Sequence, residues 1–328
     1  MEKNARPLQG AMAAIGLLIL IFDSSVALEG AGTGIELCIQ TVIPSLFPFF
    51  VLSMAMTNAL VISPGKSVQM VTGLLGIPAA AVSIIIPALL GGYPVGAKCV
   101  ADYYQQKQIS KRDARRMLAF CSNAGPSFLF GMVSGFFPEK RFVWLLWMIH
   151  ISGALLTALS LPYSAEASTT DPSEFRVEKQ SVMISSAKAM CLVCCWVILF
   201  RILITFLNRW IFWAFPQWLR VFLMGILELT NGCCSLMLIP DVKARFVLCA
   251  CILAFGGICV LLQTLSVTKG LSIRSYVTGK LLQTLYSFLL SCLFVSGFRL
   301  YLAALIPILV IFLRKAQNRY GNPRALPV

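Results

Sequence analysis

Charged residues are scarce in this sequence. Asp, Glu, Lys and Arg make up 12% of its 328 residues, whereas ordinary soluble domains carry about 25%. Hydrophobic residues make up 58%, and the mean hydropathy is +0.83. A soluble fold has too little interior to hide so much apolar surface. The composition therefore excludes an ordinary soluble protein and indicates that the lipid bilayer surrounds most of the chain.

The residues of metal and acid–base chemistry are equally sparse. His150 is the only histidine, and all twelve cysteines lie inside or beside apolar runs. Zinc sites need several spaced Cys or His ligands in accessible loops. There is also no Gly-rich phosphate loop, and no nucleophile stands near a histidine and an acid. We therefore expect no metal, no disulfide framework, no catalytic residues and no enzyme activity.

Lys and Arg number 27 against 13 Asp and Glu, which gives a formal net charge of +14. No basic, aromatic-interleaved domain stands outside the apolar segments, so we expect no nucleic-acid partner. In membrane proteins, basic residues concentrate in cytoplasmic loops. Sixteen Lys and Arg fall on one expected side and seven on the other, which predicts a cell-membrane protein with both termini cytoplasmic.

Apolar segments of spanning length recur along the chain. They predict an all-α, polytopic membrane protein with about eight spanning helices and two re-entrant hairpins. The apolar segments cover residues 8–22, 37–62, 68–90, 115–137, 142–161, 181–207, 221–240, 246–267, 276–298 and 300–313.

Four of these segments are interrupted, two in each half of the chain. Leu118-Ala119-Phe120 precedes one break and Leu253-Ala254-Phe255 another, 135 residues later, and the same offset carries Tyr93 onto Glu228. Matching interruptions in two halves are typical of inverted-repeat transporters, with the solute site near the membrane midplane. Helices broken purely for packing are the competing interpretation.

The expected units follow from these breaks. They are an N-terminal span (1–34), a first repeat (35–162, hairpin tip 91–96, broken helix 123–126), a cytoplasmic linker (163–180), a second repeat (181–298, tip 228–232, broken helix 255–257), and a last span with a basic tail (299–328).

Ionisable residues within spans are costly and suggest function. Glu228 is the foremost, and it could bind a coupling Na⁺ or H⁺ or a substrate hydroxyl. Its alternative is a structural acid neutralised by Lys98 or Lys188. Lys98 could pair with an anionic solute or extend to the interface. Helix N-termini at the breaks would favour a carboxylate or phosphate. The candidate substrate-binding residues are Gly91, Gly92, Tyr93, Pro94, Gly96, Lys98, Ser122, Asn123, Gly125, Pro126, Ser127, Glu228, Thr230, Asn231, Gly256, Gly257 and Gln263.

The same residues carry a resemblance. The stretches 92–98, 122–128, 228–232 and 255–257, with Val260 and Gln263, resemble the sporulation integral membrane protein family of the YlbJ type. That family carries the nucleoside-recognition (Gate) domain, whose layout is similar to concentrative nucleoside transporters. The resemblance implies a role in spore maturation, with export of dipicolinic acid from mother cell toward forespore, across the outer forespore membrane, as the candidate.

Three functions remain open from the sequence. The first is a transporter of a small, anionic solute, with no cofactor other than a coupling ion. The second is a non-transporting scaffold for spore cortex or coat assembly, and the third, weaker one is a nucleoside transporter. A homo-oligomer is compatible with each of them.

Overall fold

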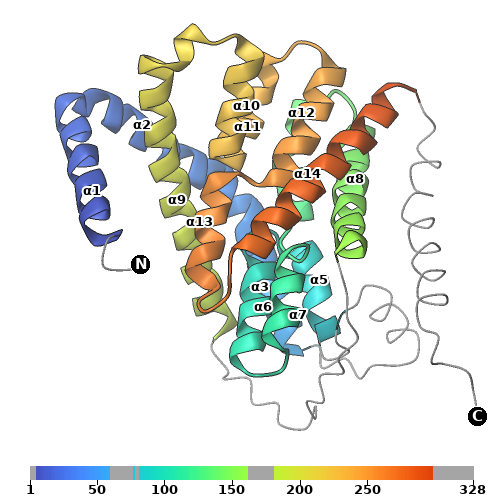
Figure 1. The fold of residues 1–328 in the computed structure, drawn as a ribbon. Helices are drawn as coiled ribbons and strands as arrows, with labels where there is room; N and C mark the ends of the chain where they lie inside the picture. The colour runs from blue at the N-terminus through green and yellow to red at the C-terminus, as the bar shows by residue number, and fades with distance from the viewer. Residues whose placement is uncertain (1–4, 60–76, 78–80, 162–180, 298–328) are drawn as a thin grey trace, which may run out of the picture.

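The computed structural model describes residues 5–59, 77, 81–161 and 181–297, and every regular element in these ranges is helical (Figure 1). This part of the chain confirms the all-α prediction. The expected linker (163–180) and the last span with its basic tail (299–328) lie outside the described residues. So do half of the sixteen basic residues behind the predicted topology, which therefore stays a prediction.

Five helices among the described residues are long and apolar enough to cross a membrane, which supports a multi-pass protein. They are Ser24–Leu52, Lys140–Ser160, Val182–Trp210, Val242–Val267 and Arg274–Val295. The sequence led us to expect about eight spans. The described part gives fewer, and one reason is that the expected segment 115–137 contains only short helical pieces (Lys111–Leu118, Phe128–Met132 and Val133–Phe136). The expected last span is not described.

The N-terminal half begins with one helix (Ala5–Phe22), which is followed after Asp23 by a long helix over residues 24–59. The boundary expected at residue 34 falls inside this long helix rather than between elements. The elements are α1 (Ala5–Phe22), α2 (Ser24–Leu37), a π-helical turn (Cys38–Val42), α3 (Ile43–Ala59), α5 (Val82–Leu90), α6 (Val95–Gln105), α7 (Lys111–Leu118), a second π-helical turn (Phe128–Met132), a 3₁₀ turn (Val133–Phe136) and α8 (Lys140–Ser160).

The C-terminal half presents a similar order of elements. A long helix is followed by a hairpin of two short helices, a helix broken in the middle, and a further long helix. These are α9 (Val182–Trp210), a 3₁₀ turn (Phe212–Ala214), α10 (Gln217–Leu227), α11 (Leu229–Cys234), a 3₁₀ turn (Ser235–Leu238), α12 (Val242–Phe255), α13 (Gly257–Val267) and α14 (Arg274–Val295).

Local sequence signals explain where several of these helices start and stop. The Ser110 hydroxyl accepts the Asp113 N–H (3.1 Å) at the start of α7. Asp241 likewise accepts the N–H groups of Lys243 (3.0 Å) and Ala244 (3.4 Å) at the start of α12. Such side-chain oxygens satisfy backbone donors that have no partner within the helix. Gly256 ends α12 in the left-handed region at φ +80°, which glycine adopts without steric cost.

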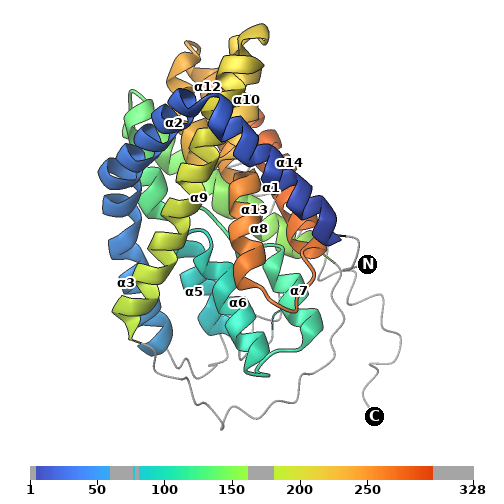
Figure 2. The same ribbon diagram turned by 90° about the vertical axis from the view of Figure 1, so that its left-hand side faces the viewer.

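Small residues bring helices from the two halves into close contact. A Cβ added at Gly30 would lie 2.8 Å from the Ile202 backbone, and one at Gly34 would lie 3.0 Å from that of Ile198. Small residues four apart let helix backbones approach in membranes. This stripe fixes α2 against α9, and Figure 2 shows the two side by side.

The two hairpins enter the molecule from opposite ends. In both views α5, α6 and α7 lie in the lower part, and α10 and α12 in the upper part (Figures 1 and 2). At the upper end the Arg245 guanidinium donates to the carbonyl oxygens of Phe136 (2.8 Å) and Ile239 (3.0 and 2.8 Å). This ties together the segments that precede α8 and α12. The interior ends of both hairpins therefore face each other near the middle of the bundle.

Candidate functional site

The two hairpin tips and the two helix breaks meet through backbone contacts. A Cβ added at Gly92 would lie 3.3 Å from the Gly125 nitrogen, so the first tip touches the first break. One added at Gly257 would lie 3.3 Å from the Glu228 Cα, so the second tip touches the second break. Because glycine has no Cβ, the backbones can approach this closely. The sequence predicts that these four features form one site, and in the structure each tip packs against a break.

Tyr93 links the first tip to the second break. The Tyr93–Pro94 peptide is cis, and the phenol ring lies against Gly256, where an added Cβ would come within 3.1 Å of the ring. The Tyr93 hydroxyl donates to the Leu253 carbonyl oxygen (3.1 Å), in the last turn of α12. Its oxygen also accepts a hydrogen bond from Lys280 Nζ (3.0 Å). One side chain therefore connects the first hairpin, α12 and α14.

Lys280 is a buried cation in the middle of this site. Its side chain is 1% exposed, and the ammonium donates to Tyr93 Oη (3.0 Å), to Gln283 Oε1 (2.7 Å) and to the Ser122 carbonyl oxygen. All three N–H donors are used. Among the described residues no carboxylate pairs with it. A buried charge without a counter-ion is expensive, so stability alone gives no reason to keep it there.

Gln283 extends this network to the first break and to α8. Its amide nitrogen donates to Asn123 Oδ1 (2.9 Å) and to the His150 carbonyl oxygen (3.3 Å). The His150 ring accepts the Ala124 N–H at Nε2 (3.0 Å). The non-helical backbone of the first break thus has partners from two long helices. Unwound backbone is tolerated at membrane depth only where protein or water satisfies it in this way.

Glu228 occupies the second tip and starts a new helix there. Its carboxylate is 2% exposed and accepts the N–H groups of Thr230 (2.9 Å) and Asn231 (2.7 Å) and the Asn231 amide (2.7 Å). The Asn231 oxygen accepts from Arg201 Nη1 (2.9 Å) on α9. Arg201 is therefore joined to Glu228 through one amide, and neither Lys98 nor Lys188 supplies the neutralising charge that the sequence suggested.

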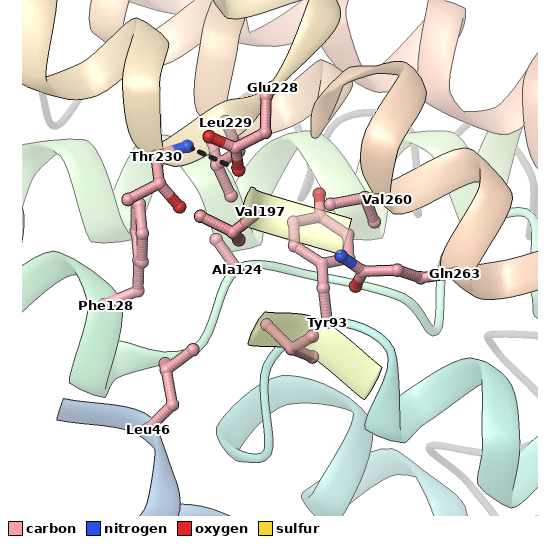
Figure 3. A pocket seen from close by; sticks show the side chains of 11 residues that line it. Leu46, Tyr93, Ala124, Phe128, Val197, Glu228, Leu229, Thr230, Val260 and Gln263 are labelled. Atoms are coloured by element: carbon pink, nitrogen blue, oxygen red, sulfur yellow. Dashed lines mark hydrogen bonds between the residues drawn. The ribbon is translucent and has the colours of Figure 1, made fainter. Parts of the chain in front are cut away.

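A small cavity lies between the two tips (Figure 3). Its polar lining comes from Tyr93, Glu228, Thr230 and Gln263, and its apolar lining includes Leu46, Phe128 and Val260. The volume is about 30 Å³, which suffices for about one water molecule. An organic solute does not fit in this conformation, so binding one would require the tips to separate.

Some expected site residues lie elsewhere or in a different kind of element. Lys98 pairs with Asp102 on its own helix (2.6 Å), and both side chains are about two-fifths exposed, at 37% and 41%. Thr230 and Asn231 lie in α11 rather than in a long turn, because the Glu228 carboxylate caps that helix at once. Gln263 reaches the cavity and donates to Cys259 Sγ (3.2 Å).

The first break is longer than the sequence indicated. The chain leaves helical structure after Leu118 and resumes it at Pro126, so the break covers 119–125 rather than 123–126. Proline suits the first turn of a helix, where its missing N–H has no cost. Gly91, Gly92, Pro94 and Gly96 lie in or beside the first tip, and Ser122, Asn123, Gly125 and Ser127 lie in or directly after this break.

Sequence reasoning missed four residues of this network. Lys280, Gln283, His150 and Arg201 were not among the candidates. The signal for two of them was present, because Lys280 and Arg201 are charges within apolar segments. Gln283 follows Lys280 by one helical turn and shares its face. The partners themselves lie up to 187 residues away along the chain, and no local pattern shows them.

The described residues therefore define a class: multi-pass, all-α membrane proteins with charged groups buried where broken helices meet. Comparison with known proteins points the same way. Over 145 residues the chain is 30% identical to "Sporulation integral membrane protein YlbJ" of Bacillus subtilis (strain 168). The aligned part is 43% of this chain and 36% of that relative, so the chain spans about a third of its length. No protein-family model and no solved structure matches the chain.

Proposed function

We propose that this protein is a membrane transporter of a small anionic solute. Two re-entrant hairpins and two broken helices, related as an inverted repeat, would hold the solute near the bilayer midplane. The observation that carries the proposal is the meeting of both tips and both breaks around one cavity, with the Lys280 ammonium behind its Tyr93 wall. No enzyme activity is part of the proposal.

The order of the elements supports an inverted repeat. The two tips, Tyr93 and Glu228, lie 135 residues apart, and α8 and α14 begin 134 residues apart. The first hairpin comes from the lower end of the bundle in Figure 1 and the second from the upper end. Transporters with this design place the solute site between the repeats, where discontinuous helices leave backbone groups free.

The basic residues around the tips favour an anion over a neutral solute. The buried Lys280 lies behind Tyr93, and the half-buried Arg201 reaches Glu228 through Asn231, so two basic groups stand near one carboxylate among the described residues. A carboxylate that enters the cavity meets the Tyr93 hydroxyl and the Gln263 amide first. The ammonium behind Tyr93 then strengthens the attraction, because charges interact strongly in surroundings of low dielectric constant.

The relative's name and the family resemblance narrow the solute class. A sporulation integral membrane protein of this type suggests a role in spore formation, and dipicolinic acid moving from mother cell toward forespore is the candidate. It is a small, planar, aromatic dicarboxylate. Such a molecule fits the hydrogen-bonding walls of the cavity and the basic residues behind them better than a nucleoside does. Coupling to Na⁺ or H⁺ and a homo-oligomeric state stay predictions.

Uptake into proteoliposomes tests the proposal. Purified wild-type protein should accumulate labelled dipicolinate above protein-free liposomes. Lys280→Met should reduce uptake at least tenfold, since losing a charge-assisted contact costs about 1.5–3 kcal/mol and 1.4 kcal/mol is a factor of about ten. Lys243→Met, on the exposed first turn of α12, is the matched control and should transport normally.

The same experiment separates transport from a scaffold role. A scaffold would leave dipicolinate outside the liposomes, while cells that carry changes at the tips would still load their spores normally. If the Lys280→Met variant took up dipicolinate as fast as the wild type, Lys280 would have no role in binding the solute.

A further inference from the structure

A second, larger hollow lies about one helical turn from the small cavity. It is an open groove of about 490 Å³, lined by Gln40, Thr41, Ser45, Met132, Phe136 and Cys234 among others. A volume of 300–1,000 Å³ is typical of small-molecule sites. Unlike the small cavity, the groove has room for an organic solute in this conformation.

The same three structural elements line both the groove and the cavity. On the helix that contains α3, Ser45 lines the groove and the adjacent Leu46 lines the cavity. Across the second π-helical turn, Met132 faces the groove and Phe128 the cavity. On α11, Cys234 faces the groove and Thr230, one turn earlier, the cavity. The two hollows are therefore consecutive positions on one path between these elements.

Three apolar side chains separate the two hollows. Leu46 is 9% exposed, Phe128 5% and Met132 6%. Met132 and Phe128 lie in a π-helical turn, whereas Leu46 lies in α3, four residues after another π-helical turn that ends at Val42. Such turns often occur at functional sites, because their helical register can change locally. The barrier is thus small and lies on backbone that can adjust.

Part of the groove lining is polar, although apolar groups make up more of it. Gln40, Thr41 and Ser45 contribute amide and hydroxyl groups to it, and Gln40 also donates to Glu36 (2.9 Å). One guanidinium group stands at its edge, because Arg245 donates to the carbonyl oxygen of Phe136 (2.8 Å), which lines the groove. Polar groups of this kind suit water and a hydrophilic anion rather than lipid chains.

We infer that this groove is the outer vestibule of the solute site, which takes a small hydrophilic anion, with Leu46, Phe128 and Met132 closing the way inward. Phe136, whose carbonyl oxygen accepts a hydrogen bond from Arg245, lies at one edge of the groove. This inference rests on the proposed function for the identity of the solute. The existence of a water-filled path to the cavity does not depend on it.

Cys234 provides a native probe of the groove. A charged, membrane-impermeant methanethiosulfonate reacts with thiols in water and not with thiols that face lipid. Cys191 and Cys195 are also exposed, but they lie on α9, whose outer face carries Met183, Leu199 and Leu203. Peptide mapping of the labelled full-length protein in sealed membranes should therefore find Cys234 modified from one side only, with Cys191 and Cys195 unmodified. The Cys234→Ser variant should lose that label.

The barrier is tested at a cysteine on its inner side. Cys259 is buried beside Gln263 of the cavity and should be protected in the wild type. Phe128→Ala should raise its labelling rate on the order of tenfold or more, since minor open states are populated at about 0.1–10%. Ile184→Ala, on the outer face of α9, is the control that should leave Cys259 protected.

The outcomes separate this inference from the proposed function. Equal labelling of Cys234, Cys191 and Cys195 would overturn the inference, because the reagent would then report exposure rather than water. An unlabelled Cys234, or a Cys259 that stays protected in Phe128→Ala, would also overturn it, even where dipicolinate uptake is intact. If Cys234 is labelled from one side only and Cys259 becomes reactive in Phe128→Ala, but no dipicolinate is taken up, the path is supported and dipicolinate is rejected as the solute.

Discussion

Gly96 is the point where the first hairpin touches the first break most closely. A Cβ added there would lie 1.7 Å from the Cys121 carbonyl oxygen and 2.9 Å from its carbon. Real Cβ contacts under 3.0 Å essentially do not occur, so Gly96→Ala must push this backbone away by at least about 1.3 Å. The obstacle is backbone, which has no rotamer to change, and the neighbouring Ser122 carbonyl oxygen is an acceptor for Lys280.

We expect Gly96→Ala to cost at least about 3 kcal/mol, the upper end for overpacking, which lowers Tm by roughly 4 °C or more, since the entropy of unfolding is about 2.1 cal/mol/K per residue and the chain has 328 residues. Thermal unfolding of purified protein in detergent measures this. Gly279→Ala should behave alike, because its Cβ would lie 2.0 Å from the Ala119 carbonyl oxygen. Gly32→Ala is the control: it is an exposed helix position with nothing within 4 Å, so Tm should hold or rise. An unchanged Tm in Gly96→Ala would refute the packing described at the tip.

Three further changes test the network. Tyr93→Phe leaves Lys280 with one acceptor fewer and should cost about 1–3 kcal/mol in thermal unfolding, whereas a Tm equal to wild type would mean that the hydroxyl contributes nothing. Asn231→Leu separates Arg201 from Glu228, and a double-mutant cycle with Arg201→Met should give a coupling of about 1–3 kcal/mol; additive losses would contradict the link. Gly256→Ala should lose more stability than Gly270→Ala, because both glycines have φ near +80° but only Gly256 packs on Tyr93.

Much of the architecture could be predicted from the sequence because lipid leaves few choices. Apolar stretches of spanning length must become helices there. Gly256 and Pro126 therefore marked real interruptions, and Glu228 stood out as a charge within an apolar run. Boundaries were less accurate: the capping carboxylate of Glu228 shortened the second turn, and the chain enters the first break at Ala119.

Charge partners were the part that sequence could not supply. Lys280 meets Tyr93 across 187 residues and Ser122 across 158, and no periodicity encodes such a distance. Lys98 shows the opposite case. Asp102 follows it by four residues, a spacing at which opposite charges pair on one helix face. That local signal accounts for Lys98 without any solute.

We propose that a solute binds where the tips and breaks meet, and an experimentally determined complex with dipicolinate would show whether it does. We expect the molecule between Tyr93, Gln263 and Glu228, with the two tips further apart than they are now and Lys280 still behind Tyr93. A molecule bound only on the outer, lipid-facing surface, with the small cavity unchanged, would rule out this site.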